Sequence, residues 1–215
     1  DKKTNKKKDK ETGLRDFSSM IDFITAADGN AADYSAILDT DAFAKFEAVN
    51  YMLGNPDCIR NNYNNYYVYF RRSDGKAVII PYDYDRCLGL TADWNPTGSA
   101  SMYLEPYTRR IAANENTQYN PLYKNLICKG APAGEGSVLK KYRADLLGLS
   151  DSVLLTADAF NAYKDKFKNR YVKHVSGAVA HNDLSFDSNE AGNVPYAEYV
   201  STKLRTLSDN IDNYI

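Results

Sequence analysis

The stretch from residue 57 to residue 89 restricts the fold more than any other part of the chain. Residues 66–71 alternate in the manner of a β-strand, and residues 76–82 contain an apolar run typical of a buried strand. Between them, residues 73–75 read Ser-Asp-Gly, a turn sequence. The pattern predicts an antiparallel hairpin. Because a hairpin brings its two ends together, the loops before and after it should meet in space.

Acidic and amide side chains gather in these two loops. Asp57 lies in the first loop with Asn62 five positions later, and Asp83 and Asp85 follow the second strand. Carboxylates placed together repel one another unless a cation or a proton lies between them. Since the donors are carboxylate and amide oxygens, the pattern favours magnesium, manganese or calcium over zinc.

Helical periodicity predicts that the rest of the chain is mainly α-helical, so the expected fold class is α+β with one inserted β-hairpin. Asp39 or Asp41 is the expected N-cap of the second helix, and Gly54 is its expected end. Residues 91–120 lack periodicity and are predicted as long loops. The expected helices cover about residues 14–27, 38–54, 121–127, 138–147, 157–175 and 196–215.

The apolar stripes of these helices are expected to form the core. They comprise Leu14, Phe17, Ile21 and Ile24 in the first helix, Phe43, Phe46, Val49, Met52 and Leu53 in the second, Leu139, Tyr142 and Leu146 in the fourth, Phe160, Tyr163, Phe167 and Tyr171 in the fifth, and Val200, Leu204, Leu207, Ile211 and Ile215 in the last.

The charge is distributed unevenly over the 215 residues. Residues 1–11 contain six Lys and three acidic residues, so they carry a charge of +3. The remaining residues carry −4, which gives the net charge of −1. This balance argues against a nucleic-acid-binding body. Residues 1–13 are predicted to be a disordered basic tail, and residues 14–215 a single lobe. No apolar run is long enough for a membrane span, and no signal peptide is present; the start at Asp rather than Met indicates a processed or truncated piece.

The cysteines and histidines carry less information. Three cysteines do not make a disulfide framework. Cys58 and Cys87 lie in the two acidic loops, where two packed thiols are favoured over a bridge. The only histidines, His174 and His181, give little support to a zinc site or a Ser-His triad.

The order of the acidic motifs is that of a protein-kinase catalytic loop: a helix, Asp-x-x-x-x-Asn, a hairpin, and then another Asp. Residues 36–90 also contain Asn-Tyr-Tyr-x-Tyr and a strand ending Ile-Pro-Tyr-Asp-x-Asp. In these features the chain resembles the spore-coat CotH kinase family of atypical protein-kinase-like enzymes. The resemblance is strongest over residues 36–90 and weaker over the helices that follow.

The resemblance implies the C-terminal lobe of a kinase-like fold and ATP-dependent phosphorylation of Ser or Thr on secreted or coat proteins. The implied cofactors are Mg or Mn and ATP, and the implied location is extracellular, at the cell surface or in the spore coat. By motif, the implied role of Asp57 is acid–base catalysis. Metal binding is implied for Asn62, with Asn65 as the second choice, and for Asp83 as the main ligand with Asp85 assisting, although the hairpin geometry also permits the reverse order. Phosphate contact is implied for Arg60 and Arg86 unless these are simply exposed.

The sequence also departs from the family. No glycine-rich phosphate loop is present, and few residues precede the matching stretch, so the nucleotide-covering lobe is expected to be absent from this chain. The alternative is a non-catalytic surface or spore-coat interaction module with a degenerate or calcium-filled site. A different metal-dependent hydrolase or nucleotidyl transferase is also open, and the acidic residues can serve merely in turns and caps.

Overall fold

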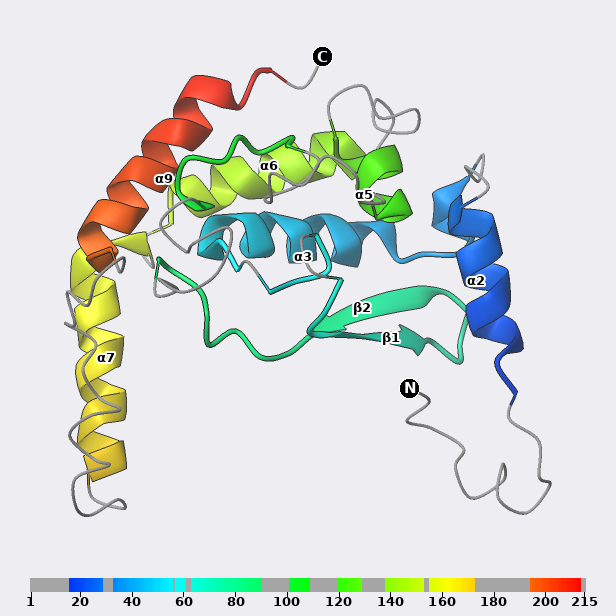
Figure 1. The fold of residues 1–215 in the computed structure, drawn as a ribbon, viewed down its shortest axis with the longest axis horizontal. Helices are drawn as coiled ribbons and strands as arrows, with labels where there is room; N and C mark the ends of the chain where they lie inside the picture. Colours follow the sequence, from blue (N-terminus) through cyan, green and yellow to red (C-terminus); the bar gives the residue numbers. More distant parts are fainter. Residues whose placement is uncertain are drawn as a thin grey trace.

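Helix α3 (Thr40–Leu53) lies at the centre of the structure, and both of its ends are fixed as the sequence predicts (Figure 1). The Asp39 carboxylate accepts a 3.0 Å hydrogen bond from the Ala42 amide, which makes it the N-cap. Gly54 ends the helix in a left-handed conformation with φ of 63°. This computed structural model describes residues 16–28, 33–55, 57–60, 63–89, 101–108, 120–128, 138–152, 155–172 and 194–213.

Strands β1 (Tyr66–Phe70) and β2 (Ala77–Pro81) form the predicted antiparallel hairpin on one side of α3. A parallel bridge between Leu38 and Ala77 joins the chain before α3 to the start of β2. Alternate residues of the hairpin face α3, among them Ala77 and Ile79, which are buried. The outward face carries large exposed side chains: Tyr67, Tyr69 and Ile80.

The helices complete the core from the other directions. Helix α6 (Val138–Ser150) packs along α3 on the side away from the hairpin (Figure 1). Helices α2 (Ser18–Asp28) and α5 (Pro121–Leu126) contact each other at one end, near the short 3-10 helix η1 (Tyr34–Ala36). Helices α7 (Ala157–Val172) and α9 (Tyr196–Asn210) lie at the opposite end. The prediction of a mainly helical chain with one hairpin is confirmed.

The buried residues of α3, α6 and α9 form one continuous core. The predicted stripes of α3, α6 and α9 contribute to it largely as expected, whereas the predicted Leu14 and Ile215 lie outside the described residues. Its central members are Phe43, Ala44, Ala48 and Tyr51 from α3, Leu139, Tyr142 and Leu146 from α6, and Leu207 and Ile211 from α9.

The buried face of α2 differs from the predicted one. Phe17, Ile21 and Ile24 are 40%, 60% and 56% exposed, whereas Phe23 is buried. Phe23 meets the ring of Phe70 edge-on, with 6.0 Å between ring centroids. Because α2 carries apolar residues on two overlapping faces, its contact with the hairpin decides which face is buried.

The prediction that the whole apolar stripe of α7 is core is also wrong. Tyr163 and Phe167 are 51% and 58% exposed. Phe160 stacks on Tyr196 with 3.7 Å between ring centroids, so α9 covers part of the first turn of α7. Val49 of α3, another predicted core residue, is likewise exposed.

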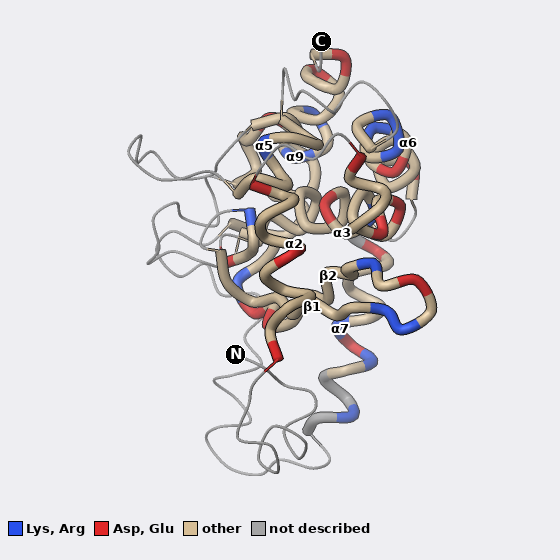
Figure 2. Tube along the Cα trace, turned by 90° about the vertical axis from the view of Figure 1, so that its right-hand side faces the viewer, with Lys and Arg blue, Asp and Glu red and all other residues tan. Residues whose placement is uncertain are grey.

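The turn of the hairpin carries charges of both signs, which alternate along the trace (Figure 2). Arg71 bonds to Asp39 at 2.7 Å and to Asp74 at 2.5 Å, so it links the turn to the N-cap of α3. These hydrogen bonds from Arg71 hold the pKa of Asp74 at about 2. Among the described helices, none has the length and apolar character needed to cross a membrane.

Candidate active site

The two loops that flank the hairpin meet, as the sequence predicts. The amide of Tyr82 donates a 3.1 Å hydrogen bond to the carbonyl oxygen of Asn65. Further on, the amide of Leu88 donates a 2.8 Å hydrogen bond to the carbonyl oxygen of Leu53. The loop that carries the first candidate acid is therefore joined at both of its ends to the loop that carries the other two.

Asp57 is held in place by neighbouring amides. The Asn65 Nδ2 donates to Asp57 Oδ2 at 2.8 Å and to the Asp57 carbonyl oxygen at 2.9 Å, and Asn64 Nδ2 lies 3.5 Å from Asp57 Oδ1. The Asp57 amide in turn donates to Asn55 Oδ1 at 3.0 Å. The structure thus brings together the predicted catalytic residue and Asn65, whose side chain orients the half-buried carboxylate.

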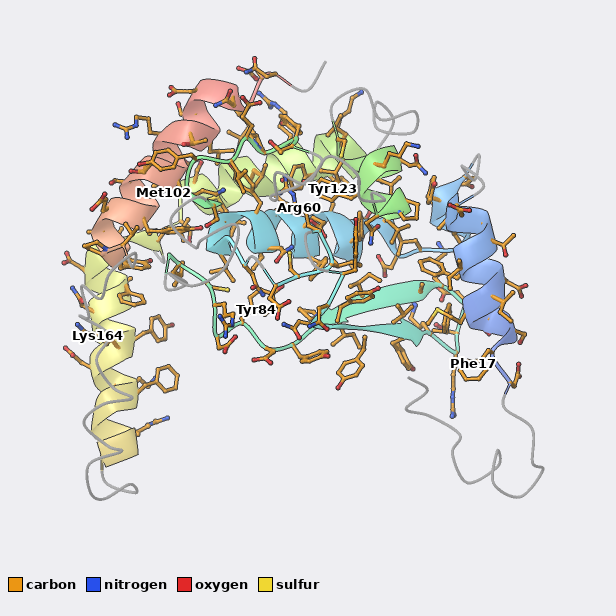
Figure 3. The ribbon with its side chains drawn as sticks, in the orientation of Figure 1. Phe17, Arg60, Tyr84, Met102, Tyr123 and Lys164 are labelled. Carbon is orange, nitrogen blue, oxygen red and sulfur yellow. The ribbon has the colours of Figure 1, made fainter. Side chains whose placement is uncertain are left out.

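Asp83 and Asp85 are exposed, while the tyrosine between them anchors the loop to α3 (Figure 3). Tyr84 Oη donates a 3.3 Å hydrogen bond to Asn50 Oδ1. Neither carboxylate forms a hydrogen bond or an ion pair with another described residue. The backbone therefore presents both carboxylates to solvent at the edge of the loop that adjoins Asn65.

The donor set of these loops fits a divalent ion that also binds phosphate. Within the described ranges, no three His, Cys, Asp or Glu side chains are grouped so that they could hold a metal. An ion here would therefore be held by fewer carboxylates together with other oxygen atoms. Magnesium bound to a nucleotide needs only one or two carboxylates besides phosphate and water oxygens. Asn62, the remaining predicted ligand, lies outside the described residues.

Backbone strain is concentrated in the same two loops. Tyr63, Asn65, Asp83 and Leu88 have φ between 56° and 60°, and they are the only non-glycine residues with positive φ in the described part of the chain. Such conformations are uncommon, and each persists only where surrounding structure enforces it. They cluster in proteins at sites that bind ligands or perform chemistry. This clustering is an observation separate from the residue types, and it agrees with the choice of these loops as the candidate site.

Arg60 lies in the interior and not at the candidate site. Its side chain is 2% exposed, and its Nη2 donates to the carbonyl oxygens of Thr108 at 2.7 Å and Pro106 at 3.2 Å. The guanidinium also lies 4.4 Å from the ring centroid of Tyr123 (Figure 3). Neither a phosphate contact nor an exposed position, the two expectations for Arg60, agrees with this burial. Its hydrogen-bond partners are backbone carbonyl groups in the interior.

The remaining predicted residues of the two loops are Arg86, Cys58 and Cys87. Arg86 is half-buried next to Asp85. Cys58 and Cys87 are buried free thiols, in agreement with the packed-thiol expectation. Burial raises the pKa of the Cys58 thiol to about 11, so it stays protonated near neutral pH.

Glu47 is a buried acid that the sequence reasoning missed. It lies on the core face of α3 with 0% exposure, and neither of its carboxylate oxygens accepts a hydrogen bond from a described residue. Burial raises its pKa to about 7, although the nearby charge of Arg60 acts in the opposite direction. The signal in the sequence was its spacing, because Glu47 follows Phe43 by one helical turn on an otherwise apolar face.

Replacing Glu47 by Gln should remove a pH dependence of stability. Between pH 4.5 and about 7 the folded protein binds a proton at Glu47 that the unfolded chain releases, so stability falls as the pH rises. The difference in unfolding free energy between variant and parent should grow by about 3 kcal/mol from pH 4.5 to pH 8. Urea unfolding across this range measures it. The exposed Glu198→Gln is the control, and parallel curves for Glu47→Gln and parent would refute the assignment.

An open apolar groove of about 420 Å³ adjoins the second loop. Tyr84 and Pro81 form one wall, and the solvent-facing side of α3 forms the other. Lys45 is its only charged residue; the remaining lining side chains are Ala42, Phe46 and Val49.

Three comparisons with known proteins bear on this site. The family model described as CotH kinase protein matches residues 1–133, which include α3, the hairpin and both loops. A search of curated proteins and a search of solved structures each found no match. The matched region spans more than half of the sequence and contains every candidate residue described above. The chain therefore belongs to the CotH kinase family.

Proposed function

We propose that this chain transfers the γ-phosphoryl group of ATP to a serine or threonine hydroxyl of a protein, with Asp57 as the acid–base catalyst. The observation that carries the proposal is the position of Asp57: its carboxylate is oriented by Asn65 in a loop joined to the one with Asp83 and Asp85. Membership of the CotH kinase family supports the same reaction class.

Asp57 would act on the acceptor. As the hydroxyl oxygen bonds to the γ-phosphorus and the bond from that phosphorus to the β-phosphate oxygen breaks, the hydroxyl proton passes to the Asp57 carboxylate and ADP leaves. Asn65 donates to Oδ2, so it fixes the direction in which the carboxylate accepts the proton. A short, anionic and oriented side chain is what this step requires.

Asp83 and Asp85, with Asn62 as the predicted third donor, would hold magnesium or manganese together with the nucleotide. The bound ion neutralises charge on the phosphate oxygens. Because these two carboxylates are exposed on a loop whose tyrosine is anchored on α3, they can meet a nucleotide without rearrangement of the core. Comparing Asp83→Ala with Asp85→Ala would show which carboxylate contributes more to binding of the metal–nucleotide complex.

The wider setting is also part of the proposal. The helices and hairpin would correspond to the C-terminal lobe of a kinase-like fold. The acceptor would be a secreted or spore-coat protein, and the site of action would be outside the cell or in the coat. Family membership supports each of these points.

The test is the melting temperature of the full 215-residue chain with Mn²⁺, with and without ATP. A ligand that binds only the folded state raises the midpoint, and at 100 times its Kd the rise should be about 5–10 °C. Asp83→Ala should abolish the ATP-dependent rise. Asp74→Ala, an exposed carboxylate at the hairpin turn, should retain it.

Other outcomes point elsewhere. A rise with calcium alone would favour the non-catalytic interaction module over the kinase. AMP linked to protein, in place of phosphate, would identify a nucleotidyl transferase. The absence of any metal-dependent rise with ATP would contradict the proposed nucleotide site.

A further inference from the structure

A single buried tyrosine of the C-terminal helix touches the ends of both loops. Tyr199 of α9 is 0% exposed. Its hydroxyl donates a 3.2 Å hydrogen bond to the carbonyl oxygen of Met52, in the last turn of α3. The hydroxyl of Ser101 donates a 3.5 Å hydrogen bond to the Tyr199 hydroxyl oxygen. One phenol group therefore connects α9, α3 and the segment that follows the second loop.

Two glycines make room for this ring. A Cβ atom on Gly54, where the first loop begins, would overlap with the Tyr199 hydroxyl and with Ser101 Oγ. A Cβ atom on Gly89, where the second loop ends, would lie 3.2 Å from Tyr199 Cδ2. The tyrosine thus occupies the space that both glycines leave open, and it fills the junction between the loops.

The rest of α9 reinforces this junction. Lys203, one turn after Tyr199, is 1% exposed and donates a 2.8 Å hydrogen bond to the carbonyl oxygen of Ser101. Its Nζ also lies 3.4 Å from the ring centroid of Tyr51 in α3. Met102, which Figure 3 places beside α9, packs against Tyr199. The start of the helix is fastened as well, because the Val194 amide donates a 3.3 Å hydrogen bond to the Gly89 carbonyl oxygen.

We infer that Tyr199 is a positioning residue for the candidate active site, and that α9 belongs to that site although it lies beyond residue 133, where the family match ends. It holds Gly54, at the end of α3, and Gly89, at the end of the second loop, at a fixed separation. Asp57 follows Gly54 by three residues, and Asp85 precedes Gly89 by four. As a statement about catalysis, the inference rests on the proposed function.

The backbone conformation of the second loop explains why a contact from Tyr199 is needed. Leu88, next to Gly89, has φ of 60°, and Asp83 has φ of 58°. Non-glycine residues stay in this region only when neighbouring contacts over-determine the backbone. Tyr199 supplies such a contact from a helix far away in the sequence.

The experiment compares hydrogen exchange in the parent chain and in Tyr199→Phe, which keeps the ring and removes the hydroxyl. The amide of Leu88, bonded to the Leu53 carbonyl, and the amide of Asp57, bonded to Asn55 Oδ1, should exchange roughly threefold to tenfold faster. Tyr34→Phe is the matched control, because the buried Tyr34 hydroxyl also donates to a backbone carbonyl, that of Ala27, at 3.0 Å. It should leave both amides unchanged.

A second variant protects the test against misfolding. Ser101→Ala removes the other hydroxyl of the junction and keeps the carbonyl that Lys203 binds. It should accelerate the same two amides. Unchanged exchange at both amides in both variants would overturn the inference, whatever the chain catalyses.

The catalytic part of the inference has its own readout. In an active parent, Tyr199→Phe should lower kcat at saturating Mn²⁺ and ATP by roughly threefold to tenfold while KM for ATP changes less, and Tyr34→Phe should lower neither. Equal kinetics in Tyr199→Phe and Tyr34→Phe would refute the positioning role and leave the proposed function intact. An inactive parent would refute the proposed function, and the exchange measurement would still decide the structural claim.

Discussion

Replacing Asp57 by Asn is expected to lower kcat for phosphoryl transfer by about 10²- to 10⁴-fold, the usual contribution of a general base. The substitution keeps the size of the side chain and leaves an oxygen that can accept from Asn65 Nδ2, so the loop should keep its shape. The binding of nucleotide should persist, because Asp57 acts on the acceptor hydroxyl. Transfer of labelled phosphate from ATP to Ser/Thr acceptor proteins measures the loss, and the thermal shift with Mn²⁺ and ATP measures the retained binding.

A matched control separates this role from a general effect of charge. Asp74→Asn makes the same change at the hairpin turn, where the carboxylate bonds to Arg71. It should leave kcat within a factor of two or so, as expected for a surface substitution remote from the chemistry. Comparable rates for parent and Asp57→Asn, with both folded, would remove Asp57 from the proposed mechanism.

Replacing Gly54 by Ala should destabilise the chain by about 2–5 kcal/mol. Alanine pays roughly 1–2 kcal/mol for the left-handed conformation that Gly54 adopts with φ of 63°. Its methyl group would also overlap with the Tyr199 hydroxyl and with Ser101, and overpacking of this kind costs about 1–3 kcal/mol. Chemical denaturation, read as a change in midpoint at constant m-value, measures the loss.

Gly75→Ala isolates the steric part. Gly75 has a similar left-handed φ of 75°, but nothing lies within 4 Å of the position its Cβ would take. This variant should lose only the conformational contribution of about 1–2 kcal/mol. Equal losses for the two variants would mean that the junction between α3 and α9 relaxes without cost.

The sequence alone was sufficient to predict those structural features that depend on interactions between residues close together in the chain. The N-cap, predicted as Asp39 or Asp41 and found at Asp39, the end of α3 at Gly54, and the strands and turn of the hairpin each depend on residues within a few positions of one another. The meeting of the two loops followed from the hairpin, because antiparallel strands bring their outer ends together. These features predicted, without any tertiary information, that the loop with Asp57 adjoins the loop with Asp83 and Asp85.

The sequence alone could not predict the position of a side chain whose burial depends on residues far away in the chain. The partners of Arg60 are carbonyl groups 46 and 48 positions later, and no local pattern announces that an arginine will be buried against them. The periodicity of α2 could not choose between Ile21 and Phe23 for burial, because the choice depends on Phe70 of the hairpin. Asn65 was the weaker of two amide candidates in the motif, and only the three-dimensional contact shows it on the Asp57 carboxylate.

The contact between Tyr199 and Met52 joins residues 147 positions apart, and this separation determines when the contact can form during synthesis of the chain. At roughly 5–20 residues per second, a ribosome adds Tyr199 roughly 7–30 seconds after Met52. During that interval the nascent chain already carries both acidic loops but lacks the helix that closes behind them. The contacts that join the two loops to α9 therefore form only after α9 has been made.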